Sequence, residues 1–264
     1  MGMFEETRGE HRMKWVALMP GAVIAMGIIL TSATARAQDR EAAFLAGETI
    51  DCPGCNLAGV SLKRRNLAGA DLSGANLQEA ILHKTDLRGA NLSGANLVDA
   101  NLNRANLTRA NLQNADLTGA MLFAANASAA DFSGAKLKQA LMGDVRLIRA
   151  NLEGADLSFA DLGGAKMTDA RLAHATLTRA DLRLTALFRA HMQGVVAEDT
   201  YFAGADMRGA DLTGAVLLRS NFHEADLGDA NLSQADLFQA NLSTASLQNA
   251  QLSGTRMPDN TVHP

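Results

Sequence analysis

The sequence predicts an all-β solenoid, because its residues repeat with a period of five over about two hundred positions. At every fifth position of residues 57–257, 39 of 41 residues are Leu, Met or Phe, and 31 of these are Leu. Two positions earlier, over residues 55–255, 31 of 41 are Ala, and between the two columns, over residues 56–256, 24 of 41 are Asn or Asp. Helical burial recurs every 3.6 residues and strand burial every two. A strict period of five therefore indicates short extended segments joined by corners and stacked around one continuous core.

The residues of a single repeat unit, such as Ala90-Asn91-Leu92-Ser93-Gly94, each have a predictable local role. The Ala and Leu lie two residues apart, so both can point to the same side of an extended segment. The Asn between them points to the other side. The last two residues are often Ser-Gly, Thr-Gly or Arg-Gly, which suits a turn. One such unit has a single apolar side and needs its neighbours to bury it.

The first 37 residues are predicted to be a secretory signal peptide. Basic residues between Arg8 and Lys14 precede an uncharged run over residues 15–30, and Ala35-Arg36-Ala37 then has the form that a signal peptidase accepts. A permanent membrane anchor is the alternative, but sixteen residues are fewer than the roughly 20 that a spanning helix needs. We therefore expect cleavage after Ala37, export to the periplasm and no stable membrane span in the mature chain.

The repeat pattern resembles the pentapeptide-repeat family, whose motif is Ala-(Asn/Asp)-Leu-x-x. The resemblance covers about three quarters of the chain. It implies a right-handed quadrilateral β-helix in which four units make one square coil, with the Leu and Ala positions inside. Residues 56–257 would then form roughly ten coils, which extend about 50 Å at the spacing of stacked strands.

Residues 38–55 are expected to cap the first coil. A short helix is predicted over 39–47, with Gly47 as its stop. Cys52 and Cys55 enclose Pro53-Gly54, a pair of residues suited to a tight turn. A redox site or half of a metal site is possible for this spacing, but repeat residues follow directly and a second Cys pair is absent from the sequence. In an oxidising compartment we favour a structural disulfide.

Residues 258–264 form a C-terminal tail that is too short for a capping helix. Members of the family that inhibit gyrase dimerise through their C-terminal ends. The resemblance therefore raises the hypothesis of a homodimer formed near Leu247, Leu252 and Met257.

Two clusters of apolar residues are expected on the outside of the coils. One contains Met121, Phe123 and Leu141. The other is the candidate partner patch that we favour, and it comprises Val196, Val216, Leu218 and Phe238. Outward apolar clusters can bind partners. Single apolar residues on a protein surface are also ordinary, so both interpretations remain open.

Composition and motifs argue against catalysis. The chain has 264 residues, a net charge of -4 and two Cys, which disfavours a strongly basic nucleic-acid binder and a four-Cys zinc site. His174 and His191 are expected one coil apart, but no carboxylate or Cys pattern completes a metal site there. We expect no catalytic residues, no cofactor and no metal.

The sequence favours an exported, non-catalytic rod that binds a protein partner or acts as a scaffold in the cell envelope. The alternative is a cytosolic DNA mimic that inhibits or protects gyrase, as some members of the family do. That alternative needs a strongly negative surface, whereas residues 56–257 hold 19 Lys and Arg against 20 Asp and Glu, a net charge of -1. We therefore expect no nucleic-acid partner, and the sequence leaves the protein partner unknown.

Overall fold

A turn every five residues shapes the chain from Asn56 onward. In nearly every unit the fifth residue donates its N–H to the carbonyl of the second, as Ala70 does to Leu67 at 3.1 Å. The exception is Thr200, whose N–H donates to Ser220 Oγ at 3.2 Å. The fourth residue has a positive φ in every unit, between 53° and 74° over residues 54–254. This is the geometry of a type II turn, which favours Gly at that position. Only 15 of the 41 units have Gly there, so side chains in the left-handed region, at about 1–2 kcal/mol each, must be offset by the stacking of the coils.

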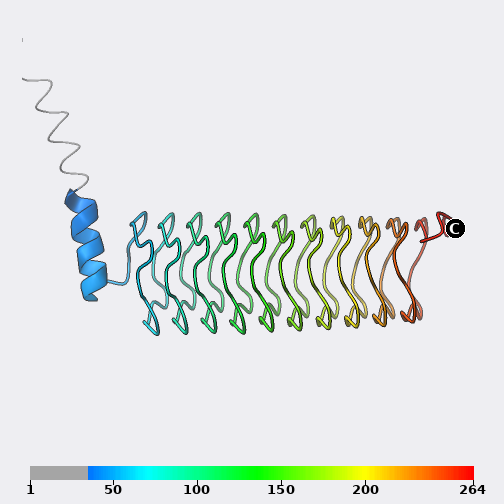
Figure 1. Cartoon of the computed structure of the whole chain (residues 1–264), viewed down its shortest axis with the longest axis horizontal. Coiled ribbons are helices and arrows are strands. Elements are labelled where there is room, and N and C mark those ends of the chain that lie inside the picture. The colour runs from blue at the N-terminus through cyan, green and yellow to red at the C-terminus, as the bar shows by residue number, and fades with distance from the viewer. Residues whose placement is uncertain (1–34) are drawn as a thin grey trace, which may run out of the picture. The chain divides into compact units, whose positions relative to one another are not determined.

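The computed structural model describes residues 35–264 (Figure 1). A helix covers residues 35–46, and the chain then winds into coils of twenty residues. The helix starts four residues before the expected 39 and ends one residue before Gly47, which has a φ of 83°. Most of the predicted signal peptide lies outside the described residues. Within residues 35–264, no helix is both long enough and apolar enough to cross a membrane.

Successive coils are joined by a parallel hydrogen-bond ladder. The first residue of each unit forms a bridge with the residue twenty positions later, from Asn56↔Asn76 to Asp236↔Arg256. Three hydrogen bonds connect each unit to the next coil. For example, Leu77 N–H donates to Asn96 O at 2.7 Å, and Asn96 N–H donates to Ala75 O at 2.9 Å. Paired residues are single bridges rather than long strands, because the turns leave one extended residue pair per side.

The interior of the coils is filled with the repeat's apolar residues, which confirms the predicted direction of the Leu and Ala columns. In the inward-facing column that recurs every five residues, the Leu side chains from Leu57 to Leu237 are at most 1% exposed. Hydroxyl residues replace Ala at five buried positions, namely Thr85, Thr185, Thr200, Ser220 and Thr255. Each donates to a backbone carbonyl of the preceding coil. No buried side-chain polar atom in the described chain lacks a hydrogen-bond partner.

Two neighbouring coils contain stacked aromatic rings. Phe202 and Phe222 occupy positions where most units have Leu, and both are completely buried. Their ring centroids are 4.9 Å apart and their planes differ by 10°. Ala197, which lies where a Leu is expected, is buried one unit before Phe202. The order of residues therefore places a small and a large side chain next to each other in one coil.

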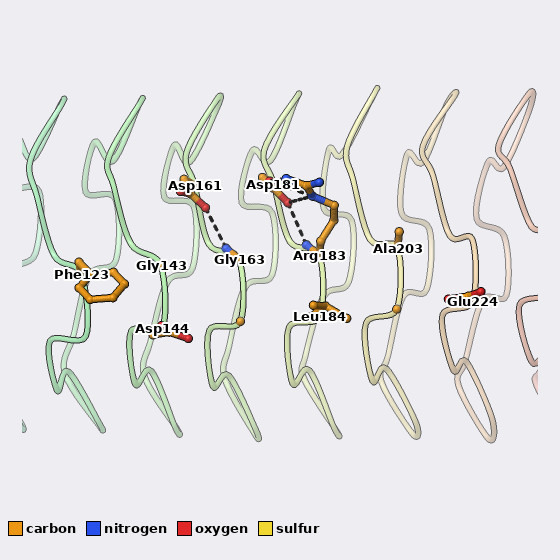
Figure 2. A pocket seen from close by; sticks show the side chains of 12 residues that line it. Phe123, Gly143, Asp144, Asp161, Gly163, Asp181, Arg183, Leu184, Ala203 and Glu224 are labelled. Carbon is orange, nitrogen blue, oxygen red and sulfur yellow. Dashed lines mark hydrogen bonds and ion pairs between the residues drawn. The ribbon is translucent and has the colours of Figure 1, made fainter.

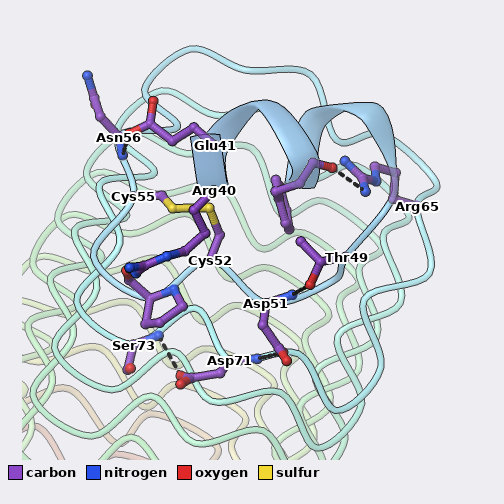
Figure 3. Close-up of a disulfide and its surroundings, with 12 residues drawn as sticks. Arg40, Glu41, Thr49, Asp51, Cys52, Cys55, Asn56, Arg65, Asp71 and Ser73 are labelled. Carbon is purple, nitrogen blue, oxygen red and sulfur yellow. Dashed lines mark hydrogen bonds between the residues drawn. A yellow bond between two sulfur atoms is a disulfide. The ribbon is translucent and has the colours of Figure 1, made fainter. Parts of the chain in front are cut away.

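The N-terminal helix packs on the first coil through Phe44, which is completely buried. Arg65 lies at an Ala position, and its guanidinium stacks 4.6 Å from the centroid of the Phe44 ring while donating to Phe44 O at 2.9 Å. Glu41 Oε1 accepts the N–H of Asn56 at 2.9 Å. The exception to the repeat at Arg65 is therefore part of the cap (Figure 3).

The structure joins Cys52 and Cys55 by a disulfide beside this helix. Both residues are buried, with Cys52 N–H donating to Asp71 O at 2.8 Å. Arg40 Nη1 donates to Pro53 O within the small loop that the disulfide closes. The bridge and the helix together hold the entry of the chain over the first coil.

The C-terminal tail turns back on the last coil, which the sequence did not predict. Val262 forms an antiparallel bridge with Arg256, and His263 N–H donates to Thr255 O at 2.8 Å. This hairpin covers one side of the coil only. Leu242, Leu247 and Leu252 remain half-buried at the end of the core.

Candidate binding groove

One outer side of the coils is hollowed into an open groove of about 570 Å³ (Figure 2). The first, third and fourth residues of each unit point outward, and the residues that line the groove come from six successive coils, from Phe123 to Glu224. Gly143 and Gly163 occupy third positions on its floor, between the larger Phe123 and Arg183 in the same column. The hollow is therefore formed where two glycines, which have no side chain, occupy the third position in consecutive coils. A second hollow of about 270 Å³, lined by Phe159 and Tyr201, shares three residues with the groove, which are Asp161, Asp181 and Arg183.

Exposed apolar side chains are concentrated around this groove. Nine large hydrophobic residues of the described chain are exposed. Five of them border the two hollows or share a repeat unit with their lining, namely Phe123, Leu141, Phe159, Leu184 and Tyr201. Leu184 is 74% exposed and lies at a turn position with a φ of 58°. A cluster of exposed apolar side chains commonly marks a binding surface.

The groove is also acidic. Its lining includes Asp144, Asp161, Asp181 and Glu224 against a single cation, Arg183. Arg183 binds Asp181 through two contacts, Nε–Oδ1 at 2.9 Å and Nη2–Oδ2 at 2.5 Å. This hydrogen bonding lowers the pKa of Asp181. Asp161 Oδ1 accepts the N–H of Gly163 at 3.0 Å, so the turn itself orients that carboxylate.

The structure brings the four residues of the candidate partner patch onto one side of the coils. Val196 and Val216 form a parallel bridge, and Leu218 and Phe238 occupy the third positions of consecutive coils there. All four are half-buried. The guanidinium of Arg256 lies 4.2 Å from the Phe238 ring centroid and covers part of it. The patch therefore exists as a cluster but presents less apolar surface than the groove.

Sequence reasoning found Phe123 and Leu141 but missed Phe159, Leu184 and Tyr201. These three lie outside the Leu and Ala columns, and only comparison of positions twenty residues apart would reveal them as neighbours. The same comparison shows Gly143 and Gly163 below Phe123. The signal was present, but it is spread over five coils rather than contained in one motif.

His174 and His191 belong to another side of the coils. His191 lines a hollow of about 380 Å³ with Glu153 and Arg171, which form an ion pair at 3.0 Å. In the part of the chain that the structure describes, no group of three or more His, Cys, Asp or Glu is arranged to hold a metal ion. The absence of a catalytic site remains an expectation from the sequence.

Three units carry Asp at the first position and Arg at the third, and these pairs predict an acid-sensitive fold. In Asp86–Arg88, Asp181–Arg183 and Asp206–Arg208, the hydrogen bond from Arg lowers the pKa of the Asp. A folded-state pKa below the unfolded value of about 3.9 contributes stability above that value, which is lost as the pH falls through the folded pKa. The melting temperature should therefore fall below about pH 4.

Circular dichroism melts between pH 6 and pH 2 would measure this dependence. Replacing the three Asp with Asn keeps the acceptor of the turn N–H, which Asn provides in many units, but removes the titrating group. The triple variant should lose part of the acid sensitivity, as should the variant with the three Arg changed to Gln. An unchanged pH profile in both variants would show that these pairs contribute nothing.

The repeat region matches the model of the family described as Pentapeptide repeats in eight copies, over residues 55–122 and 130–257. A comparison with curated proteins found no match. Among solved structures, the chain is 31% identical to HetL of the cyanobacterium Nostoc sp. strain PCC 7120, a pentapeptide repeat protein involved in regulating heterocyst differentiation. That match covers 83% of this chain and 96% of HetL, with a TM-score of 0.46.

A thylakoid-lumen pentapeptide repeat protein of Arabidopsis thaliana is also 31% identical, over 32% of this chain and 59% of that one, with a TM-score of 0.32. QnrB1, a plasmid-mediated fluoroquinolone resistance protein, is 18% identical over 74% of this chain and 90% of its own, with a TM-score of 0.32. These superpositions are too loose to carry an argument about function. The matches to the family model, which cover well over half of the chain, show that the chain belongs to the pentapeptide-repeat family.

Proposed function

We propose that the protein is an exported, non-catalytic rod that binds a protein partner in the cell envelope. In this proposal residues 1–37 direct export and are removed after Ala37, and the mature chain works in the periplasm. Its repeat region is a right-handed quadrilateral β-helix whose outer sides serve as binding surfaces. The basic head, apolar run and Ala35-Arg36-Ala37 site support the location.

The groove is the observation that carries the binding role. Its floor is built from the backbone of stacked turns, each held by the ladder, so it is rigid before a partner arrives. A rigid site loses little conformational entropy on binding. Exposed Leu184 and Phe123 in the groove, and Tyr201 in the adjoining hollow, supply apolar contact, and the carboxylates around them orient a bound partner through charge. The patch of Val196, Val216, Leu218 and Phe238 is the second candidate surface.

End-to-end pairing through the C-terminal coils is a competing arrangement of two copies. Leu247 and Leu252 are half-buried, and their N–H groups donate to no backbone carbonyl in the described chain. An end of this kind offers both apolar surface and free ladder positions to a second copy. The homodimer proposed for the C-terminal coils would use Leu247, Leu252 and Met257.

Cell fractionation and affinity capture test the function. Tagged protein should be found in the periplasmic fraction, and recovery from the cytosol would instead favour the gyrase-directed alternative. Captured from envelope extracts, the Leu184→Asp variant should lose a partner that the wild type retains, by tenfold or more. The Leu45→Asp variant is the matched control, because Leu45 is also exposed but lies on the capping helix. Equal capture by both variants would exclude the groove, and the Leu218→Asp variant then tests the second patch.

A further inference from the structure

Charge is separated along the side of the coils that contains the groove. We call this side the groove face and define it as the first, third and fourth residues of the units that begin at 61, 81 and every twenty residues to 221. Between residues 61 and 124 it has four cations and no acidic residue. This basic end comprises Lys63, Arg64, Lys84 and Arg104, with His83 among them. Between residues 141 and 224 it has four acidic residues and one cation, Arg183. This acidic end comprises Asp144, Asp161, Asp181 and Glu224.

The ladder stacks the basic residues directly. Arg64 N–H donates to His83 O at 3.1 Å, and Lys84 N–H donates to Asn103 O at 3.0 Å. The turn positions of Arg64, Lys84 and Arg104 therefore follow one another at about 4.8 Å, the spacing of adjacent strands. Like charges at that spacing repel one another. Desolvation and the charges of the neighbouring Lys and Arg residues lower the pKa of His83, as expected for a crowded cationic surface.

The basic end has no counter-charge within the molecule. Lys63, Arg64, Lys84 and Arg104 are exposed, and none of them forms an ion pair in the described chain. At the acidic end, Asp144 and Asp161 are likewise outside every ion pair of residues 35–264, and Glu224 contacts only His223, at 3.4 Å. By contrast, Asp199 on the neighbouring side is paired with Arg219 at 2.8 Å. The groove face thus keeps both signs of charge available.

Apolar residues lie between the two ends. Phe123 is 46% exposed and Leu141 is 50% exposed, in consecutive coils. Gly143 and Gly163 follow them and form the hollow into which a side chain of another molecule can fit. The order along the face is therefore cationic, apolar and acidic.

From this order we infer that the partner of the groove face is a second copy of this chain, docked antiparallel with a two-fold axis near Phe123 and Leu141. The basic end of each copy then meets the acidic end of the other, and the apolar centres meet across the axis. The inference rests on the proposed function, since it names the occupant of the groove. A two-fold interface brings the same surface of both subunits together, so that surface must be complementary to itself. A face with opposite charges at its two ends meets this condition only when the copies run in opposite directions.

The dimensions indicate a modest interface. The face spans eight coil intervals between residues 64 and 224, or about 38 Å. A unit of five residues reaches at most about 17 Å across. Contact is therefore limited to about 650 Å² per copy, near the lower end of stable interfaces. We expect a dimer that depends on concentration and weakens with salt, because exposed charge pairs are screened.

Charge-reversed variants test the arrangement by complementation. Lys84→Glu with Arg104→Glu leaves six acidic residues and three cations on the face, and Asp144→Lys with Asp161→Lys leaves seven cations and two acidic residues. Sedimentation equilibrium at low salt should show dimers for the wild type and a tenfold or greater loss of affinity for each double variant alone. An equimolar mixture of the two double variants should recover dimers of both chains. All four substitutions are at exposed or half-buried outward positions, and recovery in the mixture itself shows that both variants are folded.

Two controls separate other assemblies. Arg109→Glu reverses a charge on the adjacent side and should leave the dimer intact. If Leu252→Asp abolishes the dimer while the double variants keep it, the copies pair end to end and the antiparallel arrangement is wrong. A wild type that is monomeric at 200 µM, or a mixture that stays monomeric, would also overturn the inference. In those cases a partner still lost by Leu184→Asp would leave the proposed function standing with a foreign protein in the groove.

Discussion

Replacing Phe202 with Ala should lower the free energy of unfolding by about 3–5 kcal/mol, the range for truncating a buried Phe. The ring is completely buried and stacks on Phe222 in the next coil. The preceding unit has Ala197 where a Leu is usual, so the inward side chain one unit earlier is too small to fill the cavity. Urea unfolding followed by circular dichroism would measure the loss, with Leu184→Ala as an exposed control that should change stability by less than about 0.5 kcal/mol.

A second substitution tests why Phe202 is large. If its ring uses the space left by Ala197, the Ala197→Leu variant alone should be overpacked and cost about 1–3 kcal/mol. Combined with Phe202→Leu, it restores the residues that the repeat normally has. The double variant should then be more stable than the sum of its two single variants predicts, by at least about 1 kcal/mol. Simple additivity would mean that the two sites do not share space.

Replacing Phe44 with Ala should detach the cap from the first coil. Truncating a completely buried Phe costs about 3–5 kcal/mol of stability, and the guanidinium of Arg65 also loses the ring on which it stacks. Each coil contacts only its neighbours, so we expect the damage to appear as fraying of the first coil rather than as global unfolding.

Hydrogen exchange would resolve this local effect. The Leu57 and Leu62 amides, which donate to Asn76 and Ile81, should exchange about a hundredfold faster in the Phe44→Ala variant. The Leu157 amide in the middle of the stack should be unchanged. Leu45→Ala alters the next residue of the same helix, which is 51% exposed, and should leave all three rates as they are. Uniformly faster exchange along the chain would contradict the nearest-neighbour picture.

The core was predictable from the sequence because the direction of each side chain is determined within its own five-residue unit. Which residues point inward follows from the five-residue pattern, and every fifth residue from Leu57 to Leu237 is buried as the pattern predicts. The exceptions need information from elsewhere in the chain. Arg65 at an Ala position is explained only by Phe44, twenty-one residues earlier, and the return of Val262 onto Arg256 depends on the end of the stack.

The surface was less predictable for a related reason. Leu184, Tyr201 and Phe159 look unrelated in the sequence, because their proximity depends on the coil length of twenty rather than on the unit length of five. The patch of Val196, Val216, Leu218 and Phe238 was found because its members lie twenty residues apart in two columns. What the sequence did not show is that Arg256 covers Phe238.

The ladder that pairs each residue with the one twenty positions later makes the protein sensitive to the phase of an insertion or deletion. Removing twenty residues from the middle would shorten the stack by one coil and leave every remaining column aligned. Removing one unit of five residues between Lys84 and Asp144 would preserve the turn, the core and the ladder, yet it would rotate everything downstream by one side. Asp144 and Glu224 would then no longer share a side with Lys84. Two chains with the same fold and nearly the same composition would then present different surfaces. Surface residues of such repeat proteins can therefore be compared only when their positions differ by a multiple of twenty residues, one full coil.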